Sequence, residues 1–162
     1  MTVVVGYVPT ETGFSTVVEA ERQASSRDVA VVIVNVIGTA GYRAPTAADD
    51  RNLDAVVAHL DKCGVSNSVR SITSDERPAE IILHVAREVD ASLIMLGLHQ
   101  RSWIARRMLG STAQAVVLAA PCPVLVVPDV DQHAGGPRAK EADAPPLRSM
   151  GQTSEWHERG QG

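Results

Sequence analysis

Short runs of branched aliphatic residues alternate with segments of helical spacing along most of this chain. The apolar runs cover residues 3–7, 30–36, 93–96 and 124–127, and Gly, Pro or polar clusters separate them from the segments between. Val65, Val69 and Ile72 mark a further, weaker strand. Continuous apolar runs of this length are typical of strands that are buried on both faces. Strands that alternate with helices favour parallel pairing through right-handed crossovers. The pattern therefore predicts an α/β fold in which helices cover a parallel sheet.

The segments between the apolar runs carry residues at intervals of three or four, which predicts amphipathic helices. Pro78 suits the first turn of one helix, and Ser111 is expected to begin the last. The positions that mark the helices are Phe14, Val17, Val18, Glu21 and Ala24; Leu53, Val56, Val57 and Leu60; Ile81, Ile82, Val85, Ala86 and Val89; and Val116, Val117 and Leu118.

Length and composition narrow the class of protein. The chain has 162 residues, and its regular pattern stops near residue 128, so we expect one domain at 1–128 and a flexible tail at 129–162. A net charge of −4 and an aromatic content of 3% argue against a nucleic-acid partner. Cys63 and Cys122 lack disulfide or metal spacing, so no metal site is predicted. The sequence shows no signal peptide or membrane span, which favours the cytoplasm.

One strand, loop and helix carry a candidate anion site. The strand Leu93–Gly97 runs into a polar loop with Gln100, and Gly110-Ser111-Thr112 then opens a helix. The N-terminus of a helix offers unpaired N–H groups and the positive end of the helix dipole to an anion. Arg101, Arg106 and Arg107 lie in the same loop. A plain helix N-terminus is the alternative to an anion site at Gly110-Ser111, and a solvated loop is the alternative for the arginines, so these interpretations stay open here.

Three segments together resemble the universal stress protein family over roughly residues 2 to 128. They are Val3-Val4-Val5-Gly6; Pro78 through Ala91 to Gly97; and Leu109-Gly110-Ser111-Thr112-Ala113 followed by Ala120 to Val127. The resemblance implies a three-layer, Rossmann-like fold of the adenine nucleotide alpha hydrolase-like type, with a five-stranded parallel sheet of order 3-2-1-4-5. It also implies a homodimer in which the last strand, Val124, Leu125, Val126 and Val127, pairs with its twin and covers the open edge.

The resemblance further implies an adenine-nucleotide site, with ATP as the expected ligand and Mg²⁺ as its counter-ion. Carried onto this sequence, the site comprises Gly6, Tyr7, Val8, Val36, Leu96, Gly97, Gln100, Arg101, Gly110, Ser111 and Thr112. Two positions depart from the family pattern: Val8 stands where an acidic residue is expected, and Gln100 stands where the loop has glycine. Glutamine adds a side chain where phosphate would approach closely.

Three functions are compatible with these residues. The leading expectation is a dimeric, cytoplasmic stress-response module that binds an adenine nucleotide or another phosphorylated ligand. Val8 and Gln100 favour a nucleotide-free dimer that acts through protein–protein contacts. A weak ATPase is the third alternative, although no acid–base or metal-ligand pair for hydrolysis stands out, so no catalytic residue is assigned and no enzyme is expected.

Overall fold

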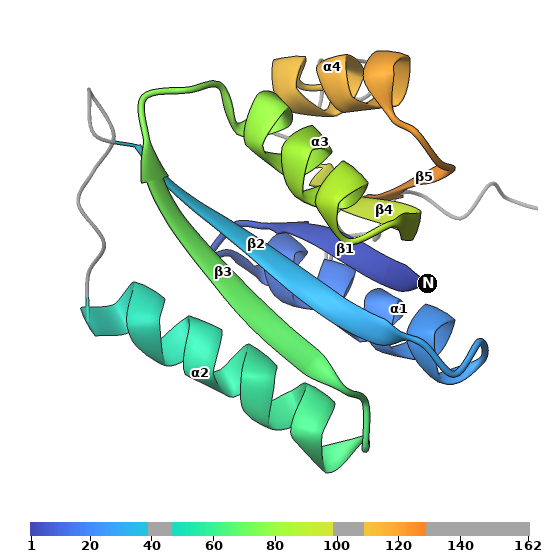
Figure 1. Ribbon diagram of the computed structural model, residues 1–162. Helices are drawn as coiled ribbons and strands as arrows, with labels where there is room; N and C mark the ends of the chain where they lie inside the picture. Colours follow the sequence, from blue (N-terminus) through green and yellow to red (C-terminus); the bar gives the residue numbers. More distant parts are fainter. Residues whose placement is uncertain (39–46, 99–108, 129–162) are drawn as a thin grey trace, which may run out of the picture. The chain divides into compact units, whose positions relative to one another are not determined.

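A computed structural model describes residues 1–38, 47–98 and 109–128 of the chain, and Figure 1 shows strands and helices alternating through them. In chain order the elements are β1 (Thr2–Tyr7), α1 (Glu11–Ser25), β2 (Ala30–Gly38), α2 (Ala47–Lys62), β3 (Asn67–Ser74), α3 (Pro78–Glu88), β4 (Ala91–Leu98), α4 (Ser111–Ala119) and β5 (Val124–Pro128). Pro78 occupies the first turn of α3, as predicted. The tail predicted at 129–162 lies outside the described residues.

The strands form one sheet of order β3-β2-β1-β4-β5, and every neighbouring pair is parallel. This confirms the predicted fold class and strand order. The chain moves outward from β1 through β2 to β3, then returns through α3 to place β4 on the other side of β1. The direction of winding therefore reverses between β1 and β4, which in open α/β sheets is where ligands usually bind.

Helices cover both faces of the sheet, and alternate strand residues divide the core in two. Val3 and Val5 of β1 pack with buried residues of α1 and α2, whereas Val4 packs with those of α3 and α4. Figure 1 shows α3 and α4 on one side of the sheet and α1 and α2 on the other. We call these the α3/α4 face and the α1/α2 face. The twofold periodicity of a strand explains the division, because successive side chains point to opposite faces.

The buried stripe of α1 differs from the predicted one. Phe14 was expected to face the core, but 42% of it is exposed. The residues of α1 that are buried are mostly small: Thr12, Gly13, Thr16, Val17, Ala20 and Ala24. Small side chains are needed here because α1 lies close to β4, where even a Cβ added at Gly97 would come within 2.8 Å of Thr16 Oγ1.

α4 also buries less than predicted. Of the three consecutive apolar residues Val116, Val117 and Leu118, only Val116 is buried, and 81% of Leu118 is exposed. Three successive residues of a helix spread over most of a turn, so they cannot all face the sheet. None of the helices in the described ranges is both long enough and apolar enough to cross a membrane.

Candidate functional site

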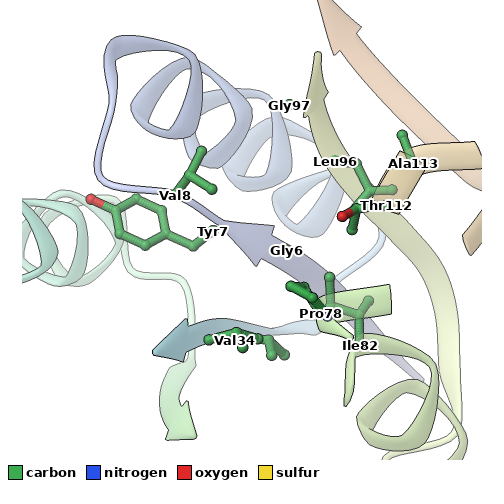
Figure 2. A pocket seen from close by; sticks show the side chains of 11 residues that line it. Gly6, Tyr7, Val8, Val34, Pro78, Ile82, Leu96, Gly97, Thr112 and Ala113 are labelled. Carbon is green, nitrogen blue, oxygen red and sulfur yellow. The ribbon is translucent and has the colours of Figure 1, made fainter. Parts of the chain in front are cut away.

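A cavity of about 190 Å³ opens at the carboxyl ends of β1, β2 and β4, on the α3/α4 face, where the winding of the sheet reverses. Figure 2 shows its surroundings. The lining residues are Gly6, Tyr7, Val8, Val34, Val36, Pro78, Ile82, Leu96, Gly97, Thr112 and Ala113. None of these side chains carries a carboxylate, an ammonium or a guanidinium group. The cavity therefore suits an apolar or neutral group better than a charged one.

Gly6 lies in the wall of the cavity, where the ends of Leu96 and Ile82 occupy the position that a side chain would take. A Cβ built at Gly6 would lie 2.6 Å from Leu96 Cδ2 and 2.8 Å from Ile82 Cδ1. Any side chain at this position would therefore push the ends of Leu96 and Ile82 aside. The glycine therefore allows the ends of Leu96 and Ile82 to pack against the central strand beside the cavity.

Tyr7 contributes backbone rather than its phenol to the cavity. Its ring is only 5% exposed and packs in the core of the α1/α2 face. Figure 2 shows the Tyr7 hydroxyl directed away from Thr112 and Ile82. Burial raises the pKa of the Tyr7 phenol above its ordinary value, and the nearby Asp49 carboxylate adds to the rise. The phenol is therefore held neutral, on the opposite face from the cavity.

Packing against α1 requires glycine at position 97. A Cβ at Gly97 would lie 2.8 Å from Thr16 Oγ1 and 2.9 Å from Thr12 Cγ2, both on α1. Thr16 is fully buried, and its hydroxyl donates a hydrogen bond to the Thr12 carbonyl at 2.7 Å. The missing side chain thus allows α1 to pack on β4, while the backbone of Gly97 lines the cavity on the other side.

The N-terminus of α4 lies beside the cavity. Gly110 is the N-cap residue, with φ −59° and ψ 157°, and no side chain of the described residues caps the helix. A Cβ at Gly110 would meet no atom within 4 Å. Neither backbone conformation nor packing among the described residues therefore requires glycine at this position. The N–H groups of the first turn have no partner within the helix, so they can receive an anion.

Ser111 lies at a neighbouring depression rather than in the cavity itself. This second hollow, of about 310 Å³, is lined by residues 75–77 of the β3–α3 connection, by Pro78 and Ala79 at the start of α3, and by Ser111, Thr112 and Ala115 of α4. Pro78 and Thr112 line both hollows, so they form the wall between them. Asp75 and Glu76 give the second hollow an acidic rim, while Arg77 is paired with Glu80.

The predicted site residues thus fall into three groups. Those that line the cavity are Gly6, Tyr7, Val8, Val36, Leu96, Gly97 and Thr112. Gly110 and Ser111 flank it at the start of α4. Gln100 and Arg101 lie outside the described residues, as do Arg106 and Arg107.

The sequence analysis missed four lining residues, Val34, Pro78, Ile82 and Ala113. Val34 could have been found because it lies two positions before Val36 and so shares its face of β2. Ile82 lies one helical turn after Pro78, on the same side of α3. Both were interpreted only as core positions, and apolar periodicity does not separate a core wall from a cavity wall.

Comparison with known proteins agrees with this architecture. Residues 1–128 match the model of the universal stress protein family. A universal stress protein from Mycolicibacterium smegmatis is 30% identical over 125 residues, which cover 77% of this chain and 95% of that protein. A universal stress protein solved in complex with cAMP superposes with a TM-score of 0.63 at 25% identity, over 78% of this chain and 95% of that one. The universal stress protein from Archaeoglobus fulgidus in complex with dAMP superposes with a TM-score of 0.58 at 25% identity, over 77% of this chain and 94% of that one. Because the family model and the mycobacterial relative both span nearly all of the sheet and its helices, this chain belongs to the universal stress protein family.

Proposed function

We propose that this chain binds an adenine nucleotide, with the base in the cavity on the α3/α4 face and the phosphates at the N-terminus of α4. The observation that carries the proposal is the junction between the two: an uncharged, mainly apolar cavity meets a helix start that no side chain caps. A neutral flat base and an anionic phosphate need these two environments side by side. Relatives of the same fold have been solved with cAMP and dAMP.

The base is expected to be held mainly by apolar contact and by backbone groups. Val34, Val36, Ile82 and Leu96 supply the walls. Val8 replaces the acidic residue that the family pattern places after the first strand, so a carboxylate contact to the ligand is absent from this position. Backbone N–H and C=O groups at Gly6 and Tyr7 are the groups expected to form hydrogen bonds with the edge of the base.

The phosphates are expected to bind the first turn of α4. A Cβ at Gly110 would meet no atom of the described residues within 4 Å, and Thr112 lies in the cavity wall. Hydrogen bonds to charged groups are worth about 1.5–3 kcal/mol each, so a few such contacts can replace the missing carboxylate. Because no carboxylate lines the cavity, Mg²⁺ would accompany ATP as a counter-ion on the phosphates rather than as a protein-bound metal.

The chain is proposed to act as a binding module in the cytoplasmic stress response rather than as an enzyme. Among the described residues that line the cavity, Tyr7 is the only one with a titratable side chain, and its phenol lies on the opposite face. General acid–base catalysis needs a titratable group within hydrogen-bond reach of the reacting atoms. Nucleotide binding without rapid turnover is therefore expected, and a weak ATPase is tested by incubating the protein with ATP and measuring released phosphate.

A homodimer through β5 is part of the proposal. β5 is at the edge of the sheet, and its residues Val124–Val127 are only half-buried within one chain. Val117 and Leu118 of the neighbouring helix α4 are exposed. An apolar edge strand next to exposed apolar side chains favours pairing with a second copy. These same features, together with Val8, favour the second candidate function, a nucleotide-free dimer that binds protein partners.

The first experiment asks which of the two functions applies. Freshly purified protein is denatured and the released small molecules are identified by mass spectrometry, and nucleotide-free protein is titrated calorimetrically with ATP, ADP, AMP and GTP. Bound or titratable adenine nucleotide supports the proposed site. No release and no binding heat would overturn it and leave the nucleotide-free dimer, which sedimentation of the same sample measures independently.

Gly110→Val then tests the position of the phosphates. The branched side chain would fill the open space before the first turn of α4, and losing even one charge-assisted hydrogen bond should weaken binding by about tenfold or more. Ala119→Val, at the other end of α4, is the matched control. Both variants should remain dimeric, and unchanged nucleotide affinity in Gly110→Val would show that the phosphates bind elsewhere.

A further inference from the structure

A cluster of metal-ligating side chains lies on the α1/α2 face, on the other side of the sheet from the nucleotide cavity. Glu21 of α1, His59 of α2 and Cys63, which follows the last turn of α2, place their ligand atoms within 4.8 Å of one another. Figure 1 shows α1 and α2 together on this side of the sheet. His59 and Cys63 are four positions apart, so a helical turn brings them to the same side, and the Cys63 N–H bonds to the His59 carbonyl at 3.1 Å.

The imidazole of His59 is the unexplained part of this cluster. Its Nε2 atom is buried and has no hydrogen-bond partner, the one such side-chain nitrogen or oxygen in the part of the chain that the structure describes. The ring is held in place by Phe14, whose ring centroid lies 5.8 Å away. A buried polar atom without a partner is unfavourable, and native structures usually satisfy it with water, an ion or a side chain. The same imidazole contributes a ligand nitrogen to the cluster with Glu21 and Cys63.

The other two groups complete the set. Glu21 Oε1 accepts a hydrogen bond from the Ser25 hydroxyl at 2.9 Å, which orients the carboxylate and leaves Oε2 for another partner. The Cys63 thiol is free and exposed, so it gives the cluster an entry route from solvent. Thiolate, imidazole and carboxylate together select a cation of borderline softness. Mg²⁺ and Ca²⁺ prefer sets made of oxygen atoms alone.

We propose that Glu21, His59 and Cys63 bind a divalent cation of the zinc class, which joins α1 to α2 and leaves a fourth position to water. Ligand atoms at about 2.0–2.3 Å from a tetrahedral zinc lie roughly 3.5 Å apart, so small side-chain rotations close the site. The proposal replaces the expectation of no metal, which considered the spacing around the two cysteines. It does not depend on nucleotide binding, because the nucleotide cavity lies on the opposite face.

The test uses the full, untagged chain and Co²⁺ as a spectroscopic probe for Zn²⁺. Apoprotein is titrated with Co²⁺ under reducing conditions, followed by back-titration with Zn²⁺. One equivalent of Co²⁺ should produce a thiolate-to-cobalt charge-transfer band together with the visible bands of tetrahedral coordination, and Zn²⁺ should remove both. Absence of the charge-transfer band at stoichiometric Co²⁺, or binding only at millimolar metal, would overturn the proposal.

Matched variants assign the ligands. Cys63→Ser and His59→Gln should each weaken Co²⁺ binding at least about tenfold, and Cys63→Ser should remove the charge-transfer band. Cys122→Ser and His84→Gln, on the α3/α4 side of the fold, should bind as the unchanged chain does. Cys63 is exposed, so its replacement is not expected to disturb folding, which circular dichroism verifies. A charge-transfer band that persists in Cys63→Ser or disappears in Cys122→Ser would place the metal elsewhere and overturn the assignment.

Discussion

On the α1/α2 face, the absence of a side chain at Gly97 brings Thr12 and Thr16 of α1 against β4, whereas on the α3/α4 face the absence of one at Gly6 admits the ends of Leu96 and Ile82 in the wall of a cavity. The two glycines belong to adjacent strands of one sheet. The contrast comes from the helices: α1 meets its strand with small residues, while α3 and α4 leave the carboxyl ends of β1 and β4 uncovered. What a glycine does in this sheet therefore depends on what packs against it: short threonine side chains and helix backbone at Gly97, and the ends of longer side chains at Gly6.

The largest loss of stability is expected at Gly13 of α1, where the packing on the α1/α2 face is tightest. A Cβ there would lie 1.8 Å from the Val8 carbonyl oxygen, a backbone atom that already accepts a hydrogen bond from Thr10 N. Backbone cannot move aside as a side chain can, so Gly13→Ala should lose about 3 kcal/mol or more of unfolding free energy, the upper end of overpacking costs. Urea unfolding measures the change. Ser15→Ala, on the same turn, is the control, and similar stability of the two variants would contradict the packing argument.

Gly97→Ala should have the next largest effect. The new methyl group would press on Thr16 Oγ1 and Thr12 Cγ2, with an expected cost of about 1–3 kcal/mol in unfolding free energy. Thr16→Ala removes one of the two opposing groups, so the double variant should be more stable than the sum of the single changes predicts, by about 0.5 kcal/mol or more. A double-mutant cycle in urea measures the coupling, and strict additivity would mean that α1 does not limit residue 97.

Gly6→Ala should have the opposite balance of effects from Gly97→Ala: a small decrease in unfolding free energy and a larger decrease in affinity for the nucleotide. The atoms that a methyl group meets are the ends of Leu96 and Ile82, which can rotate, so the expected cost in unfolding free energy is below about 1.5 kcal/mol. Those displaced side chains would occupy the cavity and weaken AMP binding by about tenfold, or about 1.4 kcal/mol. Calorimetry on Gly6→Ala and Gly97→Ala compares them directly. Weaker binding in Gly97→Ala than in Gly6→Ala would reverse the assignment of the two faces.

The sequence predicted the fold well because its signals are local and periodic. Apolar strand runs and helical spacing placed each element near its observed bounds, and alternation of the two predicted a parallel sheet. The failures have a common cause, which is that contact between distant segments leaves no periodic trace. Phe14 fits a helical stripe as well as Thr16 does, and only the closeness of β4 excludes it. Ile82 looks the same in sequence whether its neighbour is core or cavity.

The smallest expected effect concerns the ionisation of Tyr7, a residue that belongs to both faces. Its backbone lines the cavity, while its ring lies on the α1/α2 face. Burial, with the Asp49 carboxylate, raises the pKa of the phenol above its ordinary value of 10.0. The folded chain therefore holds this proton more tightly than the unfolded chain. The contribution of the Tyr7 phenol to the free energy of unfolding is fully present below pH 10 and declines as pH rises above it.

The chain has two tyrosines, and Tyr42→Phe leaves Tyr7 alone for an alkaline titration followed by phenolate absorbance. The midpoint should lie above pH 10 in the folded protein. Adding AMP should not move it if the base binds in the cavity as proposed, because the cavity and the phenol lie on opposite faces of the sheet. A midpoint at the ordinary value would show that the ring is not buried, whereas a midpoint that shifts with AMP would show that the ring reaches the nucleotide and that the two faces are not independent.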